Sequence, residues 1–286
     1  MNAKTACIIV NYNDSERTLK LLDHIKDYDS VDYLIVVDNC STDESFENLS
    51  KFKHLKYFLL KSPRNGGYGF GNNCGAKKAR ELGSDYILIA NPDVWFSNEC
   101  VAHMKQTMIS YPCCAIVGAK EVRVGSWAWR YTSGLHDVLS ASLIFNKILK
   151  KRYYSKEYFE NKSIAEVEII PGCLLLVDLL KFLEVGGYDE NVFLYEEEKI
   201  LYCRMREKYT SIVDLSVEYE HNHEESHSYS LRSCIVGKQR LIRSRYYFLK
   251  NYRKINSLEL FLSRFFFQMT ILEMFVWTFV RRLIVK

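Results

Sequence analysis

The chain has 286 residues, of which 48% are hydrophobic and 26% charged, and its formal net charge is +4. A chain of this length and composition can bury a sizeable core, which excludes a disordered protein. Its 9 cysteines are scattered without a CxxC pair, which indicates a reduced, cytosolic protein and excludes a disulfide scaffold or a zinc ribbon. The apolar run at the N-terminus is too short for a signal peptide.

Charge is unevenly distributed along the chain. Residues 231–286 hold 12 Lys and Arg against 2 Asp and Glu, so this segment carries +10 and the remainder −6. A basic tail on an acidic body indicates an anionic surface as its partner, either nucleic acid or membrane lipid.

Strands and helices alternate in the N-terminal part. Short apolar strands are predicted at 6–12, 33–38, 56–60 and 86–90, with helices at 15–28, 44–52 and 70–82. This alternation predicts an α/β fold with a mostly parallel, doubly wound sheet, whose ligands bind where the strands end. We expect a loop-and-helix insertion at 120–165, a buried strand at 169–177 and helices from Leu231 onward.

Polar residues follow two of these strands directly. Asp38 and Asn39 come after the strand at 33–38, where a carboxylate can accept hydrogen bonds from a nucleobase or a ribose hydroxyl. The alternative is a helix start capped by Ser41 or Thr42. Asn91-Pro92-Asp93 follows the strand at 86–90, and Asp93 suits a divalent cation that neutralises a diphosphate. The alternative there is an ordinary turn.

A glycine-rich stretch covers residues 65–75. Five glycines allow a ligand to approach the backbone closely. The stretch matches neither the dinucleotide fingerprint, because Asn72 or Cys74 stands in the third glycine slot, nor a P-loop. The alternative is a flexible turn followed by close helix packing.

Two clusters of ionisable residues complete the candidates. Glu196, Glu197 and Glu198 follow an aromatic segment at the start of a predicted helix and could supply a general base. The alternative is that they are there only because the helix dipole stabilises acidic side chains in the first turn. His221 and His223, with His227 nearby, would point the same way from a strand and could reach a metal, or form a surface cluster.

In this order, the motifs resemble those of the inverting family 2 glycosyltransferases, and most closely the bacterial rhamnosyltransferase-type enzymes of surface polysaccharide synthesis. The matching residues are Val10 to Asn13, Val37 to Asn39 with Ser41 and Asp43, Asn65 to Gly67, Asn72, Asn73, Gly75, Asn91 to Asp93, Pro171-Gly172, Gly186 to Glu190, Phe193 to Tyr195, Glu197, Glu198 and His221. They span most of the chain.

The resemblance implies a GT-A fold, a nucleotide-sugar donor and a divalent metal, Mn²⁺ or Mg²⁺. It implies metal contacts at Asp93 and His221 and a catalytic base at Glu198, with Glu197 as the alternative. Ile200 stands where the family commonly has a second acid. The donor-binding residues implied are Asn11, Asn13, Asp38, Asn39, Asn65, Gly67, Asn72, Asn91 and Gly172.

The resemblance also implies the substrates and the location. The expected donor is dTDP-rhamnose, with UDP-galactofuranose, UDP-glucose and UDP-galactose as alternative donors. A nucleotidyltransferase is a more distant alternative for the activity itself. The expected acceptor is a lipid-linked saccharide, and the enzyme is expected to be cytoplasmic and peripheral on the inner face of the cell membrane.

Residues 1–230 are expected to form the transferase domain and 231–286 a helical extension. Residues 265–280 include one charge and are too few to cross a bilayer, so this segment is predicted to lie in the membrane interface. The side chains expected to insert are Phe265, Phe266, Phe267, Phe275, Trp277 and Phe279. The alternative is a helix packed on the protein's own core or in a homodimer. So apolar a tail argues against a nucleic-acid partner.

Overall fold

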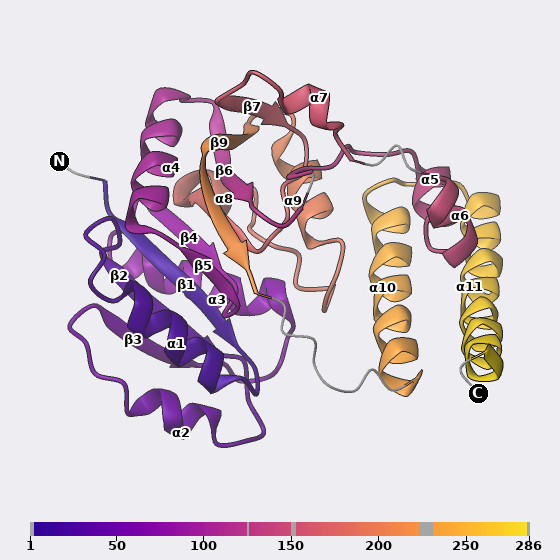
Figure 1. Cartoon of the computed structure of the whole chain (residues 1–286), viewed down its shortest axis with the longest axis horizontal. Coiled ribbons are helices and arrows are strands. Elements are labelled where there is room, and N and C mark those ends of the chain that lie inside the picture. The colour runs from indigo at the N-terminus through magenta and orange to yellow at the C-terminus, as the bar shows by residue number, and fades with distance from the viewer. Residues whose placement is uncertain (1–2, 125, 150–152, 223–230, 285–286) are drawn as a thin grey trace.

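The computed structural model describes residues 3–124, 126–149, 153–222 and 231–284, which form a central sheet with helices on both faces (Figure 1). The strands are β1 (Thr5–Asn11), β2 (Tyr33–Asp38), β3 (Tyr57–Lys61), β4 (Tyr86–Ala90), β5 (Val94–Phe96), β6 (Cys114–Glu121), β7 (Ile164–Val167), β8 (Leu174–Asp178) and β9 (Thr210–His221). The helices are α1 (Ser15–Ile25), α2 (Ser45–Ser50), α3 (Tyr68–Glu81), α4 (Asn98–Ser110), α5 (Gly134–Leu139), α6 (Leu143–Ile148), α7 (Lys156–Phe159), α8 (Leu179–Glu184), α9 (Glu197–Met205), α10 (Leu231–Asn251) and α11 (Ser257–Ile284).

The described strands form one sheet in the order β3-β2-β1-β4-β8-β6-β9-β5, with β7 beside β9. β3, β2, β1 and β4 run parallel. β8 is antiparallel to both of its neighbours, β4 and β6, and β6 is again parallel to β9. The α/β fold class predicted from the sequence is confirmed, with a parallel N-terminal half and a mixed remainder.

Both faces of the sheet are covered, which explains why its strands read as continuous apolar runs. On one face α1 and α4 supply Leu22 and Met104 to the core. On the other, α3, α8 and α9 supply Ala76, Phe182 and Leu201. The carboxyl ends of the parallel strands remain uncovered by this packing, and the candidate residues follow there.

One strand is shorter than predicted. The sequence favours a strand at 169–177, but β8 begins only at Leu174. Ile169 pairs instead with Trp129, donating its N–H at 3.2 Å and accepting at 2.9 Å. Pro171 has no N–H to donate to a ladder, and the Gly172 carbonyl accepts from the Tyr68 hydroxyl at 2.5 Å. This interruption leaves the Gly172 N–H directed away from the sheet.

The C-terminal helices form a separate layer beside the sheet (Figure 1). α10 and α11 pack against each other and against α5 and α6 of the insertion, burying Val138, Leu249 and Phe267. The expectation that Phe267 enters a membrane interface was therefore wrong, because it faces this bundle and is 3% exposed. α10 also contacts the helices that cover the sheet, because its Phe248 packs on Ile200 of α9. No helix within the described ranges is long and apolar enough to span a membrane.

Candidate active site

Asp38 ends β2 at the edge where the parallel strands terminate. Its side chain is fully buried, and Oδ1 accepts from Asn11 Nδ2 at 3.0 Å and from Ser41 Oγ at 2.6 Å. Its Oδ2 accepts from the Ser41 N–H at 3.1 Å. α2 starts later, at Ser45, so neither Ser41 nor Thr42 caps it. The segment after β2 is thus built around the Asp38 carboxylate.

Asn13 closes the same corner from the end of β1. It has a left-handed backbone, with φ of 54°, a conformation that asparagine tolerates better than most residues. Its N–H donates to Ser41 Oγ at 3.0 Å, and its Oδ1 accepts from the Thr42 N–H at 2.8 Å. Asn11, Asn13 and Asp38 therefore form one polar cluster.

The glycine-rich stretch adjoins this cluster. Asn39 Nδ2 donates to Asn65 Oδ1 at 3.2 Å and to the Gly67 carbonyl at 3.0 Å. Gly67 has φ of +89°, and a Cβ there would lie 1.9 Å from the Phe193 carbonyl oxygen. The close approach is thus to the chain's own segment before the three glutamates. Asn72 lies within α3, where its amide donates to the Tyr68 carbonyl at 3.1 Å.

A cavity of about 400 Å³ lies beyond that loop. It brings together five of the sequence-predicted residues, Asn91, Gly172, Glu196, Glu197 and Glu198. The other lining residues come from α3, the insertion, the residue before β8, the segment before α9, α9 itself and α10: Tyr68, Trp129, Ser140, Cys173, Leu194, Tyr195, Lys199, Lys238, Leu241 and Arg245. This volume is in the range of small-molecule sites.

The two candidate bases in this cavity have different surroundings. Glu197 is 3% exposed, and burial, followed by the charge of Glu198, raises the pKa of its carboxyl well above the ordinary value. Glu198 is less buried, and its Oε1 accepts the Gly172 N–H at 3.1 Å. Burial therefore favours the neutral form of Glu197, whereas the Gly172 N–H orients the carboxyl group of Glu198.

The backbone before α9 is strained. Tyr195 and Glu196 both have positive φ, 74° and 68°, which costs a non-glycine residue about 1 to 3 kcal/mol each. Strain of this kind persists only where surrounding contacts enforce it, and here it directs Glu197 and Glu198 into the cavity.

Buried ion pairs enforce that backbone. Glu196 accepts from Arg245 Nε at 2.8 Å and pairs with Lys199 at 2.9 Å. Burial alone would raise the pKa of Glu196, but the charges of Lys199 and Arg245 outweigh it and lower the pKa to about 2. Lys199 also contacts Asp137 at 2.7 Å. In addition, Ser244 Oγ donates to the Leu194 carbonyl at 2.7 Å, so α10 fastens the segment at two points.

Asp93 and His221 meet at the neighbouring β5–β9 corner. Asp93 Oδ1 lies 3.2 Å from His221 Nε2. Burial lowers the pKa of His221, but hydrogen bonds with Asp93 and Cys173 outweigh it and raise the pKa to about 10. Within the described residues, no three His, Cys, Asp or Glu side chains gather to hold a metal on their own. His223 and His227 lie outside the described residues.

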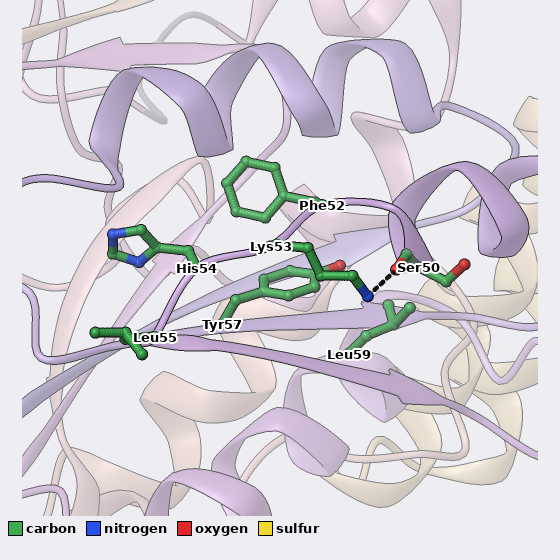
Figure 2. A pocket seen from close by; sticks show the side chains of 7 residues that line it. All are labelled: Ser50, Phe52, Lys53, His54, Leu55, Tyr57 and Leu59. Atoms are coloured by element: carbon green, nitrogen blue, oxygen red, sulfur yellow. Dashed lines mark hydrogen bonds between the residues drawn. The ribbon is translucent and has the colours of Figure 1, made fainter.

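Several lining residues were not found from the sequence, notably Tyr68, Trp129, Lys238 and Arg245. Arg245 is one of many cations in the C-terminal region, and nothing in its local pattern marks it as buried. A second hollow, of about 750 Å³, lies between α2 and β3, at the edge of the sheet (Figure 2). No predicted site residue lines it, and Lys53 there donates to the Ser50 carbonyl at 2.9 Å.

The sequence is similar to those of known glycosyltransferases. The sequence profile of the family described as "Glycosyl transferase family 2" matches residues 6–181. Rhamnosyltransferase WbbL of Escherichia coli (strain K12) is 24% identical over 208 residues, which are 69% of this chain and 75% of that enzyme.

Solved structures share the fold. The mannosyltransferase PcManGT from Pyrobaculum calidifontis, in complex with GDP-Man and Mn²⁺, superposes with a TM-score of 0.61 and 15% identity, over 96% of this chain and 74% of that one. GalNAc-T7 with UDP, GalNAc and Mn²⁺ gives a TM-score of 0.62 and 12% identity, over 77% of this chain and 44% of that one. This chain therefore spans less than half of the length of GalNAc-T7. At these identities the likeness shows a common fold alone.

Proposed function

The chain belongs to glycosyl transferase family 2, and from this premise we propose that it transfers a sugar from a nucleotide diphosphate donor to a hydroxyl of a saccharide acceptor, with inversion. One observation carries the proposal: Glu198, oriented by the Gly172 N–H, lines a cavity that begins where the parallel strands end. The rhamnosyltransferase WbbL relative supports a rhamnosyl donor, so dTDP-rhamnose is the first donor to test, and the UDP named with the GalNAc-T7 neighbour supports UDP-sugars as the second.

Glu198 is the base in this mechanism. Its carboxylate takes the proton from the acceptor hydroxyl, whose oxygen forms the new bond to the anomeric carbon as the bond to the diphosphate breaks. Attack from the face opposite the leaving group inverts the centre, and one carboxylate suffices. Glu197, held protonated by burial and by Glu198, can donate a hydrogen bond within the same cavity but is a poor base.

The donor would occupy the cluster of Asn11, Asn13 and Asp38 together with Asn39, Asn65 and Gly67. These residues share hydrogen bonds at the edge where the strands end, which is where α/β sheets bind nucleotides. Asn72 inside α3 and Asn91 and Gly172 on the cavity wall complete the proposed donor contacts.

Asp93 offers a carboxylate to a divalent cation, and such ions are commonly held by one or two carboxylates plus substrate phosphates. His221 Nε2 lies 3.2 Å from Asp93 and would first have to release the proton that its raised pKa retains, because a metal binds the neutral imidazole. Bound there, Mn²⁺ or Mg²⁺ would neutralise charge on the diphosphate as it leaves.

We also propose that α11 docks the enzyme on the inner face of the cell membrane, near a lipid-linked acceptor. Its outward face exposes large apolar side chains along five turns: Leu258, Phe261, Leu262, Phe265, Met269, Leu272, Phe275 and Val276. A continuous apolar face of this extent marks an interaction surface. Liposome flotation at low salt tests it, and sedimentation shows instead whether the face joins two copies in a homodimer.

A thermal-shift panel of nucleotide sugars tests the donor. dTDP-rhamnose and the UDP-sugars are added with Mn²⁺, with Mg²⁺, or with a chelator, because a ligand that binds the native state raises its apparent stability. Transfer is then measured with the donor that binds. If no nucleotide sugar shifts the unfolding temperature with either metal, the proposal is wrong.

A further inference from the structure

One cation in the cavity has no partner in the described part of the chain. Lys238 lines the cavity from α10, together with Leu241 and Arg245. Spacings of three and seven residues put these side chains on one face of the helix, so Lys238 lies two turns from Arg245. Lys238 is therefore directed to the same space as the glutamates.

The other lining cations are already paired. Lys199 contacts Asp137 and Glu196 at 2.7 and 2.9 Å. Arg245 contacts Glu196 at 2.8 Å. In contrast, Lys238 forms no ion pair or hydrogen bond with any described residue, although its side chain is partly buried. The paired groups neutralise each other, so Lys238 is the cation left for a ligand.

The nearby acids are committed to other contacts. Burial and the neighbouring Arg245 lower the pKa of Lys238 to about 8, against a weaker opposite effect of Glu273. Glu273 itself accepts from Ser142 Oγ at 2.8 Å. The attraction to Glu273 does not offset the burial of the Lys238 ammonium and its repulsion by Arg245, so its charged form is disfavoured, and an anionic ligand would relieve that cost.

We infer that the cavity binds an acceptor that carries a phosphate group, and that Lys238 contacts this phosphate. The inference rests on the proposed function and names the class of its acceptor. Phosphate could also come from the donor diphosphate. The cavity wall also carries Asn91 and Gly172, two proposed donor contacts, so sharing the cavity with Glu198 does not by itself distinguish the two sources. The acceptor side is favoured because Asp93, the proposed cation contact at the donor diphosphate, does not line the cavity.

The test follows acetylation of lysine side chains by acetic anhydride, read by peptide mass spectrometry. The full chain is labelled with and without UDP or dTDP and Mg²⁺, and each sample is repeated with millimolar methyl phosphate or with sodium chloride at equal ionic strength. We expect methyl phosphate to slow acetylation of Lys238 several-fold even with nucleotide bound, and to leave Lys250 unchanged. Lys250 is the matched control, because it is exposed on the same helix.

Calorimetry adds a second measurement. Lys238→Gln should weaken methyl phosphate binding roughly tenfold or more, as expected for a lost charge-assisted hydrogen bond, whereas Lys250→Gln should not. Protection by nucleotide alone, with no added effect of methyl phosphate, would assign Lys238 to the donor and overturn the inference, as would no protection at all. If nucleotide sugars bind and are hydrolysed but methyl phosphate neither binds nor protects Lys238, the inference of a phosphate-bearing acceptor is wrong and the proposed function stands. If no nucleotide sugar binds, the proposed function itself falls.

Discussion

Replacing Arg245 by methionine should release the segment that bears the proposed base, Glu198, from α10. Arg245 and Glu196 are each 3% exposed in their side chains and lie 2.8 Å apart. Arg245 Nη1 also donates to the Asp137 carbonyl and to Ser140 Oγ, both at 3.1 Å. Removing one partner of a buried pair costs about 3 to 5 kcal/mol. Because Lys199 remains beside Glu196, we expect a loss near the lower limit.

The measurements are unfolding temperature and turnover. A loss of about 3 kcal/mol corresponds to a fall of about 6 to 12 °C in a chain of this size. Turnover should fall about a hundredfold below that melting temperature, because a displacement of the base by about 1 Å has an effect of this order. Arg243→Met is the control: Arg243 is exposed on the same helix, and such a change is worth about 0.5 kcal/mol at most.

Acid unfolding gives an independent check. The folded pKa of Glu196 is lowered to about 2, so the stability that its ionisation contributes is present above its ordinary pKa of 4.5 and is lost as the pH falls towards 2. Arg245→Met weakens that shift, and less stability should then be lost across this range. A variant that is less stable yet turns over like the wild type would refute the link between Arg245 and the base.

Three further substitutions test the site. Glu198→Gln should keep donor binding in calorimetry and lower turnover by roughly 10² to 10⁴-fold; the same loss in Glu197→Gln, with Glu198→Gln active, would reassign the base. Asp93→Asn should remove most of the metal-dependent gain in donor affinity at an unchanged unfolding temperature, and full activity of this variant in a chelator would contradict the metal role. Gly67→Ala places a Cβ 1.9 Å from the Phe193 carbonyl and needs a positive φ, so it should lower the unfolding temperature, whereas Gly83→Ala, which also has a positive φ but open space around it, should cost less.

Much of the fold could be predicted because its strands are apolar and the residues that end its strands and helices are close to them in the sequence. The strands at 33–38 and 86–90 match β2 and β4 to the residue. β8 was misplaced because Ile169 and Ile170 are as apolar as the strand that follows them. Only the pairing of Ile169 with Trp129, 40 residues earlier, shows that they belong to a different ladder.

The candidate site divides in the same way. Asp38 and Glu198 stand next to turns and strand ends, so their positions could be predicted from neighbouring residues. The walls contributed by Trp129, Lys238 and Arg245 could not, because a long-range contact rather than a local pattern brings each of them to the cavity. From the sequence alone, nothing distinguishes Arg245 from the other arginines of the basic tail, because its burial depends on its ion pair with Glu196.

The contact between Glu196 and Arg245 also orders events during synthesis of the protein. The two residues are 49 positions apart, so the segment that bears the proposed base, Glu198, leaves the ribosome well before the helix that holds it. The proposed donor residues of the N-terminal strands precede both, whereas the proposed cation contact His221 lies between Glu196 and Arg245 in the chain. We therefore expect transfer only after α10 has been synthesised and has packed on the segment before α9.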